Sequence, residues 1–317
     1  MAQTVRPSII SRLYASGGAA LVGVLGAGIF FALSTSIFLS TPNLLNIGRQ
    51  TAVVALISVG MTFVVITGGI DLSVGSVVGL SGTLAAAAIT GSHLDPVLGA
   101  LVGLGVGAAI GLINGAFIAL LRVPAIVTTL ATLSIARGIA LQATNGRPIS
   151  GLTASFAFLG RGEILGAPAG FVLAILIYII GSVVLRFTTT GRHIVGLGGN
   201  EEAARLAGLP VRAYRLGIYV LTGFVSGFAG LVLMSRLGSG QPTAGAGLEL
   251  SSIAAVVLGG TRITGGQGTL IGTFLGALLI TILGNGLDLL NVGSFYQLIF
   301  VGLVLLVAVV VSRFAER

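Results

Sequence analysis

A single acidic residue, Asp71, stands between two long apolar runs of the chain. It lies at residues 67–76, in the segment Thr-Gly-Gly-Ile-Asp-Leu-Ser-Val-Gly-Ser, which joins the runs without a polar loop. Because paired glycines interrupt helices, Gly68 and Gly69 predict that one helix ends there and another starts near Asp71. Inside a membrane such breaks are tolerated where they are buried in protein or line a cavity, and a carboxylate there is a candidate functional group. An alternative with equal support is that Asp71 only caps the second helix.

A second glycine-rich interruption occurs at residues 258–268, in the segment Leu-Gly-Gly-Thr-Arg-Ile-Thr-Gly-Gly-Gln-Gly. It is followed by Gly272 and Gly276 at a spacing that is typical of helix packing. Interrupted hydrophobic segments in corresponding halves of a transporter indicate a central pathway. A tight cytoplasmic turn is the favoured alternative, since glycine pairs are typical of turns.

The best-defined local structure is predicted just after residue 199. Asn200 can accept hydrogen bonds from the free N–H groups at the start of a helix, and Glu201 and Glu202 follow in the first turn, where negative charge is favourable. Arg205 is placed to pair with Glu201 at a spacing of four residues, and Gly208 supplies a left-handed stop. The pattern predicts a short surface helix. From these residues alone, a simple connector is favoured over a helix that docks a partner.

Residue types that the chain lacks exclude several kinds of chemistry. All sixteen basic residues are arginine, so neither a phosphate-binding loop with its lysine nor a Schiff-base lysine can be present. The absence of cysteine excludes disulfides and thiol chemistry. The two histidines, His93 and His193, have no ligand-type residues clustered around them in the sequence. We therefore predict no metal site, no catalytic residue and no enzymatic activity for this chain.

The candidate residues must be positioned by membrane helices. Of the 317 residues, 8% are charged and 55% are hydrophobic, and the mean hydropathy is +1.11, whereas an ordinary soluble domain has about 25% charged residues. A helix needs about 20 mainly apolar residues to cross a bilayer. This pattern predicts an all-α polytopic membrane protein with about ten segments, of which the eighth is short enough to be a broken or re-entrant helix. The segments are residues 13–48, 50–70, 72–92, 97–121, 124–142, 169–185, 216–235, 250–261, 263–287 and 289–312.

The fourth segment carries a glycine at every fourth residue, from Gly99 to Gly115. This spacing places the glycines on one helix face, where the missing side chains let another helix approach closely. A formal match to the dinucleotide-binding fingerprint in the same stretch is spurious, because no strand precedes it. The glycines therefore predict close helix packing.

The positions of the arginines predict the orientation of the chain. With the N-terminus inside, eleven arginines lie inside and three outside, which agrees with the positive-inside rule. Both termini are then cytoplasmic, residues 186–215 form a cytoplasmic loop, and residues 143–168 form a periplasmic loop. The basic excess is thus a topology signal, and we predict no nucleic-acid binding. The inside set is Arg6, Arg12, Arg122, Arg186, Arg192, Arg205, Arg212, Arg215, Arg262, Arg313 and Arg317, and the outside set is Arg147, Arg161 and Arg236.

Several long sequence blocks resemble the permease subunits of ribose-type sugar ABC importers. They are Val-Gly-Met-Thr-Phe-Val-Val-Ile-Thr-Gly-Gly-Ile-Asp-Leu-Ser-Val-Gly-Ser at 59–76, Leu-Gly-Gly-Asn-Glu-Glu-Ala-Ala-Arg-Leu-Ala-Gly at 197–208, and the run from 241 to 261 that begins Gln-Pro-Thr-Ala-Gly. The similarity continues through the glycines of 265–268, Asn-Gly-Leu at 285–287 and Tyr-Gln at 296–297. It extends from about residue 40 to the C-terminus.

The resemblance implies that residues 1–317 form a single permease domain in the bacterial inner membrane. It implies a second permease copy, a cytosolic subunit that binds ATP and magnesium, and a periplasmic or lipid-anchored sugar-binding protein, with no cofactor in this chain. The substrate would be a monosaccharide, such as ribose or a related pentose, hexose or polyol. It also favours the docking interpretation of residues 201–207, with Asn200, Glu201, Glu202, Arg205 and Gly208 as the coupling residues.

Within that framework, the candidates for the lining or gate of the pathway are Gly68, Gly69, Asp71, Ser73 and Gly75. Two alternatives remain from the residues. An ion-coupled secondary carrier of a small polar solute would have to use Asp71, Arg137 and Asp288, which is a small set of intramembrane charges. A scaffold that anchors partner proteins through its basic loops would transport nothing.

Overall fold

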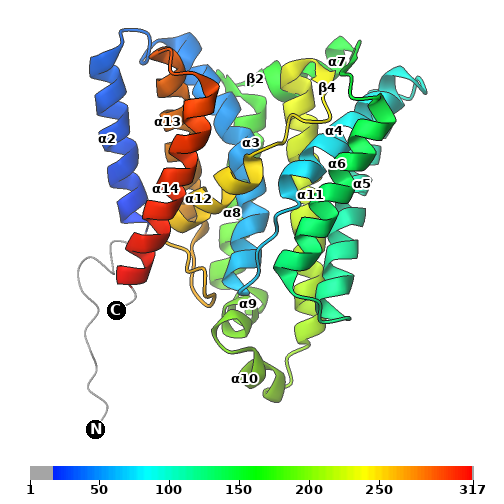
Figure 1. Ribbon diagram of the computed structural model, residues 1–317, viewed down its shortest axis with the longest axis vertical. Coiled ribbons are helices and arrows are strands. Elements are labelled where there is room, and N and C mark those ends of the chain that lie inside the picture. Colours follow the sequence, from blue (N-terminus) through cyan, green and yellow to red (C-terminus); the bar gives the residue numbers. More distant parts are fainter. Residues whose placement is uncertain (1–16, 316–317) are drawn as a thin grey trace.

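The computed structural model describes residues 17–315, with all side chains in that range except those of residues 154, 155 and 311–315. As predicted, the described part is almost entirely helical, and its strands are two residues long (Figure 1). The elements are α2 (Gly18–Ser34), α3 (Thr41–Ile66), α4 (Val74–Thr90), α5 (Pro96–Ala119), α6 (Ala125–Thr144), β1 (Ile149–Ser150), α7 (Ala154–Arg161), β2 (Glu163–Ile164), β3 (Ala167–Pro168), α8 (Ala169–Phe187), α9 (Thr189–Gly199), α10 (Glu201–Leu206), α11 (Val211–Leu237), β4 (Ser239–Gly240), α12 (Leu248–Leu258), α13 (Leu270–Leu289) and α14 (Ser294–Ala315).

Each of the ten predicted segments overlaps one main helix, but the boundary predicted at Arg49 is wrong, because α3 begins at Thr41 and continues through Arg49. Six described helices are long and apolar enough to cross a membrane, namely α3, α5, α6, α8, α11 and α13. The helices α2, α4 and α12 and the apolar part of α14 are shorter. The polytopic helical fold is therefore confirmed, whereas ten as the number of complete crossings stays a prediction.

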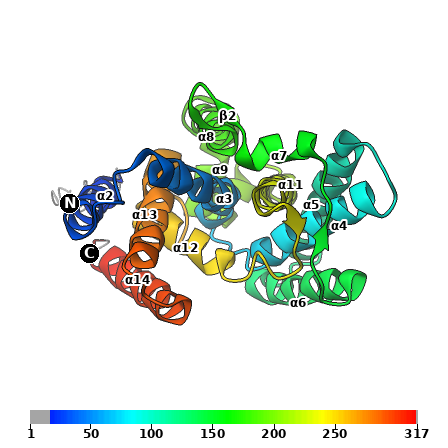
Figure 2. The same cartoon turned by 90° about the horizontal axis from the view of Figure 1, so that it is seen from above.

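The helices α3 and α11 form the centre of the bundle (Figure 2). Nearly every residue of α3 from Thr51 to Ile66 is buried, which agrees with its uninterrupted apolar sequence. The glycine face of α5 packs against α11, as the four-residue spacing predicts: a Cβ atom on Gly107 would lie 2.9 Å from Gly227 Cα. Glycine is thus required where the two backbones touch.

The chain is interrupted after α3, as the sequence predicts. The helix α3 ends at Ile66, and α4 begins at Val74, so residues 67–73 are non-helical. Figure 1 shows this segment rising from the end of the bundle that carries α10 to about half its height, where α4 begins. Gly68 has a φ of +75°, a left-handed conformation that glycine adopts without steric cost.

In the structure the second interruption is residues 241–247, which precede α12 and enter from the opposite end of the bundle. It is a different segment from the glycine-rich residues 258–268. After α11 the chain passes through β4 and descends to mid-height, where α12 begins (Figure 1). With 11 residues, α12 is about 16 Å long and cannot cross about 30 Å of hydrocarbon. It is therefore a broken-helix segment, as its short apolar run predicts. The first turns of α4 and α12 meet, because a Cβ atom on Gly75 would lie 3.3 Å from Glu249 Cδ.

The turn between α12 and α13 closes the α10 end of the bundle. Gly260, Gly265 and Gly266 have positive φ angles, so the prediction of a tight turn is confirmed. The Gly266 N–H donates to Ile66 O at 2.8 Å, which joins this turn to the end of α3. The glycine-rich turn at residues 258–268 therefore contacts the end of α3, directly before the glycine pair Gly68 and Gly69. The described start of α2 and the described end of α14 also lie toward the α10 end (Figure 1).

The loop of residues 143–168 lies at the opposite end and contains more structure than its sequence predicts. It includes α7 and the β2–β3 hairpin, and β1 pairs with β4. The loop is attached to the bundle by an ion pair between Arg49 on α3 and Glu163, 3.1 Å apart. Arg161 Nε also donates to the Arg236 carbonyl oxygen at 3.0 Å.

Candidate functional site

Asp71 is buried in the first interruption, where it stabilises a turn. Its side chain is 1% exposed, and its Oδ1 atom accepts hydrogen bonds from Ser73 N at 2.9 Å and Ser73 Oγ at 2.6 Å. The N-cap position of α4 is occupied by Ser73 rather than Asp71, and its side chain makes no capping hydrogen bond. Asp71 therefore holds the turn that precedes the helix, through bonds that a buried carboxylate requires.

Two neighbouring helices hold the interrupted segment in place. Asn114 on α5 donates from Nδ2 to Ser73 Oγ at 2.9 Å, which completes a buried chain of hydrogen bonds from Asn114 through Ser73 to Asp71. Thr129 on α6 donates to Ile70 O at 3.3 Å. The segment is thus a fixed part of the interior. Asn114 was not among the predicted site residues, although a carboxamide in a glycine-rich membrane segment is a recognisable signal.

Tyr219 on α11 supports the segment from behind. A Cβ atom on Gly69 would lie 2.6 Å from the Tyr219 hydroxyl oxygen, so a larger residue would displace the ring. Tyr219 is 2% exposed, and its hydroxyl group has no hydrogen-bond partner within residues 17–315. This contact links α11 directly to the predicted gate, and nothing in the local sequence predicts it.

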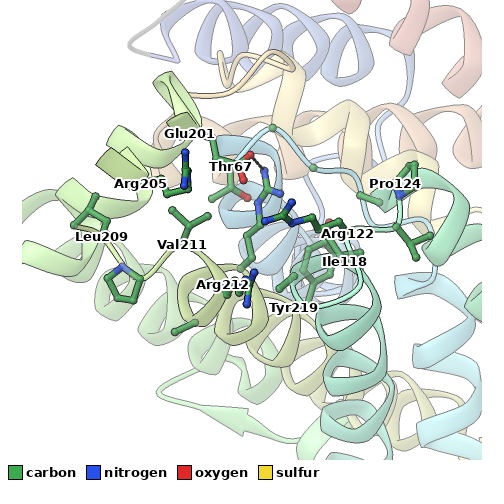
Figure 3. A pocket seen from close by; sticks show the side chains of 18 of the residues that line it. Thr67, Ile118, Arg122, Pro124, Glu201, Arg205, Leu209, Val211, Arg212 and Tyr219 are labelled. Carbon is green, nitrogen blue, oxygen red and sulfur yellow. Dashed lines mark hydrogen bonds and ion pairs between the residues drawn. The ribbon is translucent and has the colours of Figure 1, made fainter. Parts of the chain in front are cut away.

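A cavity of about 1140 Å³ opens at the α10 end (Figure 3). The predicted gate residues Gly68 and Gly69 and the predicted coupling residues Glu201, Glu202 and Arg205 line this one cavity. Asp71, Ser73 and Gly75 are not part of its lining; Asp71 and Ser73 lie deeper, in the hydrogen-bonded chain described above. Further lining residues include Thr67, Ile118, Arg122, Pro124, Leu209, Val211, Arg212, Arg215 and Tyr219.

The cavity is basic. Four arginines line it, at positions 122, 205, 212 and 215, against the two glutamates of α10, so its net charge is +2. Figure 3 shows Arg122 and Arg212 on the wall opposite Thr67 and Glu201. Sequence reasoning assigned Arg122, Arg212 and Arg215 only to membrane topology, because their meeting depends on how α10 and the ends of α5 and α11 border one cavity.

The helix α10 begins and ends as predicted. Asn200 Oδ1 accepts a hydrogen bond from Ala203 N at 2.9 Å, which is an N-cap contact. Gly208 has a φ of +81°, and Leu209 N donates to Ala204 O at 3.1 Å to close the C-terminal end. The helix lies at the surface of the bundle, where Glu201, Glu202 and Arg205 are exposed.

The predicted pairing of Arg205 with Glu201 is wrong. Arg205 instead pairs with Glu202 at 2.5 Å, and Glu201 pairs with Arg215 of α11, also at 2.5 Å. Glu201 is the first residue of a six-residue helix, so its side chain can leave the helix and reach α11. The hydrogen bond from Arg205 lowers the pKa of Glu202 below its ordinary value of 4.5, which keeps this exposed carboxylate ionised at neutral pH. The α10 helix is therefore tied to α11 by an ion pair that crosses the mouth of the cavity.

Comparison with known proteins places this geometry in a transport family. Residues 43–309 match the family model described as the permease component of a branched-chain amino acid transport system. The chain is 47% identical over 278 residues to the ribose import permease protein RbsC of Bacillus subtilis, with 87% of this chain and 86% of that protein covered. It is 43% identical over 280 residues to RbsC of Escherichia coli, with 87% of each covered. An L-arabinose ABC transporter permease protein of Azospirillum brasilense is 38% identical over 291 residues, which are 91% of this chain and 86% of that protein.

Proposed function

The chain belongs to the sugar ABC permease family, and on this premise we propose that it imports ribose, or a related pentose, hexose or polyol, across the bacterial inner membrane. The observation that carries the choice of substrate is the identity of 43–47% to ribose import permeases over 87% of the chain. The arabinose permease is less similar, at 38%, which supports ribose over arabinose as the proposed sugar.

ATP is hydrolysed in this proposal by a separate cytosolic subunit, which binds ATP and magnesium, while this chain holds no cofactor. That subunit docks on α9 and α10, which project from one end of the bundle (Figure 1). The positive-inside distribution of arginines supports a cytoplasmic location for this end and for both termini. A sugar-binding protein delivers the substrate at the opposite, periplasmic end.

The contacts of α10 define a route by which this docking reaches the pathway. Displacement of α10 moves α11 through the ion pair between Glu201 and Arg215. Tyr219 follows Arg215 by one helical turn and rests against Gly69. A shift or rotation of α11 is therefore transmitted to the interrupted segment, whose opening and closing would give alternating access to the two sides of the membrane.

A second copy of the chain covers the face that carries the two interruptions. Residues 67–73 and 241–247 leave main-chain polar groups outside helices at membrane depth, and lipid cannot satisfy such groups. In Figures 1 and 2 this face lies between α6 and α14, with α12 behind it. Two copies that meet there would enclose the pathway between them.

The experiment uses the chain reconstituted in vesicles with its ATP-binding subunit and sugar-binding protein. The wild-type complex should take up ribose only when ATP is supplied. Reversal of both charges in E201R/E202R should abolish uptake and the stimulation of ATP hydrolysis by the binding protein, because the new arginines repel Arg205 within α10 and Arg215 on α11. Basal ATP hydrolysis and the thermal stability of the complex should not change.

The conservative variant E201D/E202D retains both charges and serves as the matched control, with most of the uptake preserved. Normal uptake by the reversed variant would contradict the role of α10 in coupling. Uptake that follows an ion gradient in vesicles containing this chain alone would contradict ATP-driven import altogether.

A further inference from the structure

Four buried polar atoms around the start of α4 have no hydrogen-bond partner in the described part of the chain. Two belong to charged residues, Arg137 on α6 and Glu249 on α12, and two belong to the neutral residues Ser76 on α4 and Asn114 on α5. The atoms are Arg137 Nη2, Glu249 Oε2, Ser76 Oγ and Asn114 Oδ1. Ser76 is 2% exposed, and Asn114 is fully buried.

These groups converge on the first two turns of α4. The Glu249 carboxylate lies against Gly75, and Ser76 is the next residue of the helix. Asn114 contacts Ser73 through its other polar atom. One turn further along, Val77 and Leu80 belong to one buried cluster with Ala136 and Ala140, on the part of α6 that carries Arg137. Three helices therefore place unsatisfied polar atoms at the start of α4, and Arg137 lies on the part of α6 that packs beside its second turn.

Leaving such groups unpaired is costly at membrane depth. A buried polar group without a partner is destabilising, and a charged one is more so. The carboxylate can only accept hydrogen bonds and the guanidinium can only donate them, while the hydroxyl group can do both. A simple anion would satisfy Arg137 alone, and a simple cation would satisfy Glu249 alone. A polyol satisfies both, because each of its hydroxyl groups donates and accepts.

We propose that Arg137 and Glu249, together with Ser76 and Asn114, form a binding site for a sugar in transit through the membrane. The inference rests on the proposed function and extends it, because it adds four residues outside the predicted gate, next to Ser73 and Gly75. It also explains Gly75, since any side chain there would occupy the space of the Glu249 carboxylate. Arg137 donates to sugar oxygens, and Glu249 accepts from sugar hydroxyl groups.

The test measures uptake and ATP hydrolysis in the same reconstituted complex. R137Q and E249Q should each lower the maximal rate of ribose uptake by roughly tenfold or more, the loss expected for a charged hydrogen bond. Stimulation of ATP hydrolysis by the binding protein should stay within about twofold of wild type. Retained stimulation shows that a variant is folded and coupled. The matched controls are R147Q and D95N, which neutralise exposed residues in loops. D95N should leave the start of α5 intact, because Asp95 caps that helix and asparagine caps a helix as well as aspartate does.

A protection experiment gives a second readout, because the natural chain contains no cysteine. In the complex, a water-soluble thiol reagent should modify A246C, at an exposed position three residues before Glu249, more slowly when ribose is present at saturating concentration. Unchanged modification, or wild-type uptake by both R137Q and E249Q, would overturn the site and leave the proposed function intact. Recovery of uptake in the charge-swapped R137E/E249R variant would show a direct ion pair and would also overturn it. A wild-type complex without ATP-dependent uptake would overturn both proposals.

Discussion

At the scale of single residues, Asp71 shows how a charge is accommodated inside an apolar bundle. Its carboxylate is fully enclosed and accepts both a main-chain and a side-chain hydrogen bond from Ser73, which Asn114 holds in turn. The sequence left two interpretations open, a helix cap and a pathway residue. The structure replaces the simple cap with a turn inside a buried network, next to the segment that lines the cavity.

Substitution of Asp71 separates its structural role from its charge. D71N keeps an oxygen for both bonds from Ser73, so the complex should keep its thermal stability, while ribose uptake should fall if the negative charge serves the pathway. D71A leaves the Ser73 N–H and hydroxyl group without their acceptor and should lower the free energy of unfolding by about 1–3 kcal/mol. Thermal unfolding and uptake by the two purified variants check this. Full uptake by D71N would restrict Asp71 to holding the turn.

At the scale of elements, close contact between α5 and α11 forms the wall behind the cavity. The carbonyl oxygen of Gly223 lies where a Cβ atom on Gly107 would be placed, and Gly227 Cα is 2.9 Å from that position. The same helix carries Gly105, where an added Cβ atom would meet nothing within 4 Å. One helix therefore offers a matched pair of glycines, one in contact with another backbone and one free of contacts.

We predict opposite effects for alanine at these two positions. G107A should destabilise the protein by about 1–3 kcal/mol, because the added methyl group forces the two backbones apart. G105A should be neutral or should stabilise α5 by up to about 1 kcal/mol, since alanine favours a helix over glycine. Thermal unfolding of the purified variants measures both effects. Equal stabilities would show that α5 and α11 can separate without loss.

At the scale of the whole molecule, two of the predicted membrane segments each consist of a non-helical segment followed by a short helix. They enter from opposite ends, and the first turns of α4 and α12 meet inside the bundle. This arrangement places main-chain groups and the unpaired atoms of Arg137 and Glu249 at membrane depth. A single copy in lipid would leave the face between α6 and α14 uncovered, which is the basis for the proposed dimer.

The proposed dimer face is tested by cross-linking in the membrane. Thr243 lies in the second interruption and is exposed, so T243C should join two copies through a short bifunctional thiol reagent. Leu101 is 56% exposed on α5, away from this face, and L101C should give no covalent dimer. The molecular mass of the reacted protein on a denaturing gel is the readout. A dimer formed by L101C but not by T243C would move the interface to the α5 side.

The helices and their ends follow from information within a few neighbouring residues. Apolar runs predict the membrane helices, Asn200 and Gly208 mark the ends of α10, and paired glycines mark the interruption after α3 and the turn after α12. Two helices were missed: α7, in the loop of residues 143–168, and α9, which contains four glycines that disfavour a helix. The glycines of α9 are needed instead for contact, since a Cβ atom on Gly198 would lie 2.7 Å from Gly266 N.

The partners of the charged and polar residues were decided only by the tertiary structure. Glu201 pairs with Arg215 rather than Arg205, and Asn114 reaches Ser73 across 41 positions of the chain. Local sequence patterns therefore predict a polytopic helical protein, the interruption after α3 and the capped helix that the cavity borders, and the family resemblance predicts a permease. Capping, helix formation and glycine breaks act over one or two turns of backbone and can be read locally. Hydrogen bonds and ion pairs between helices depend on which faces meet, and that is settled only when the bundle packs.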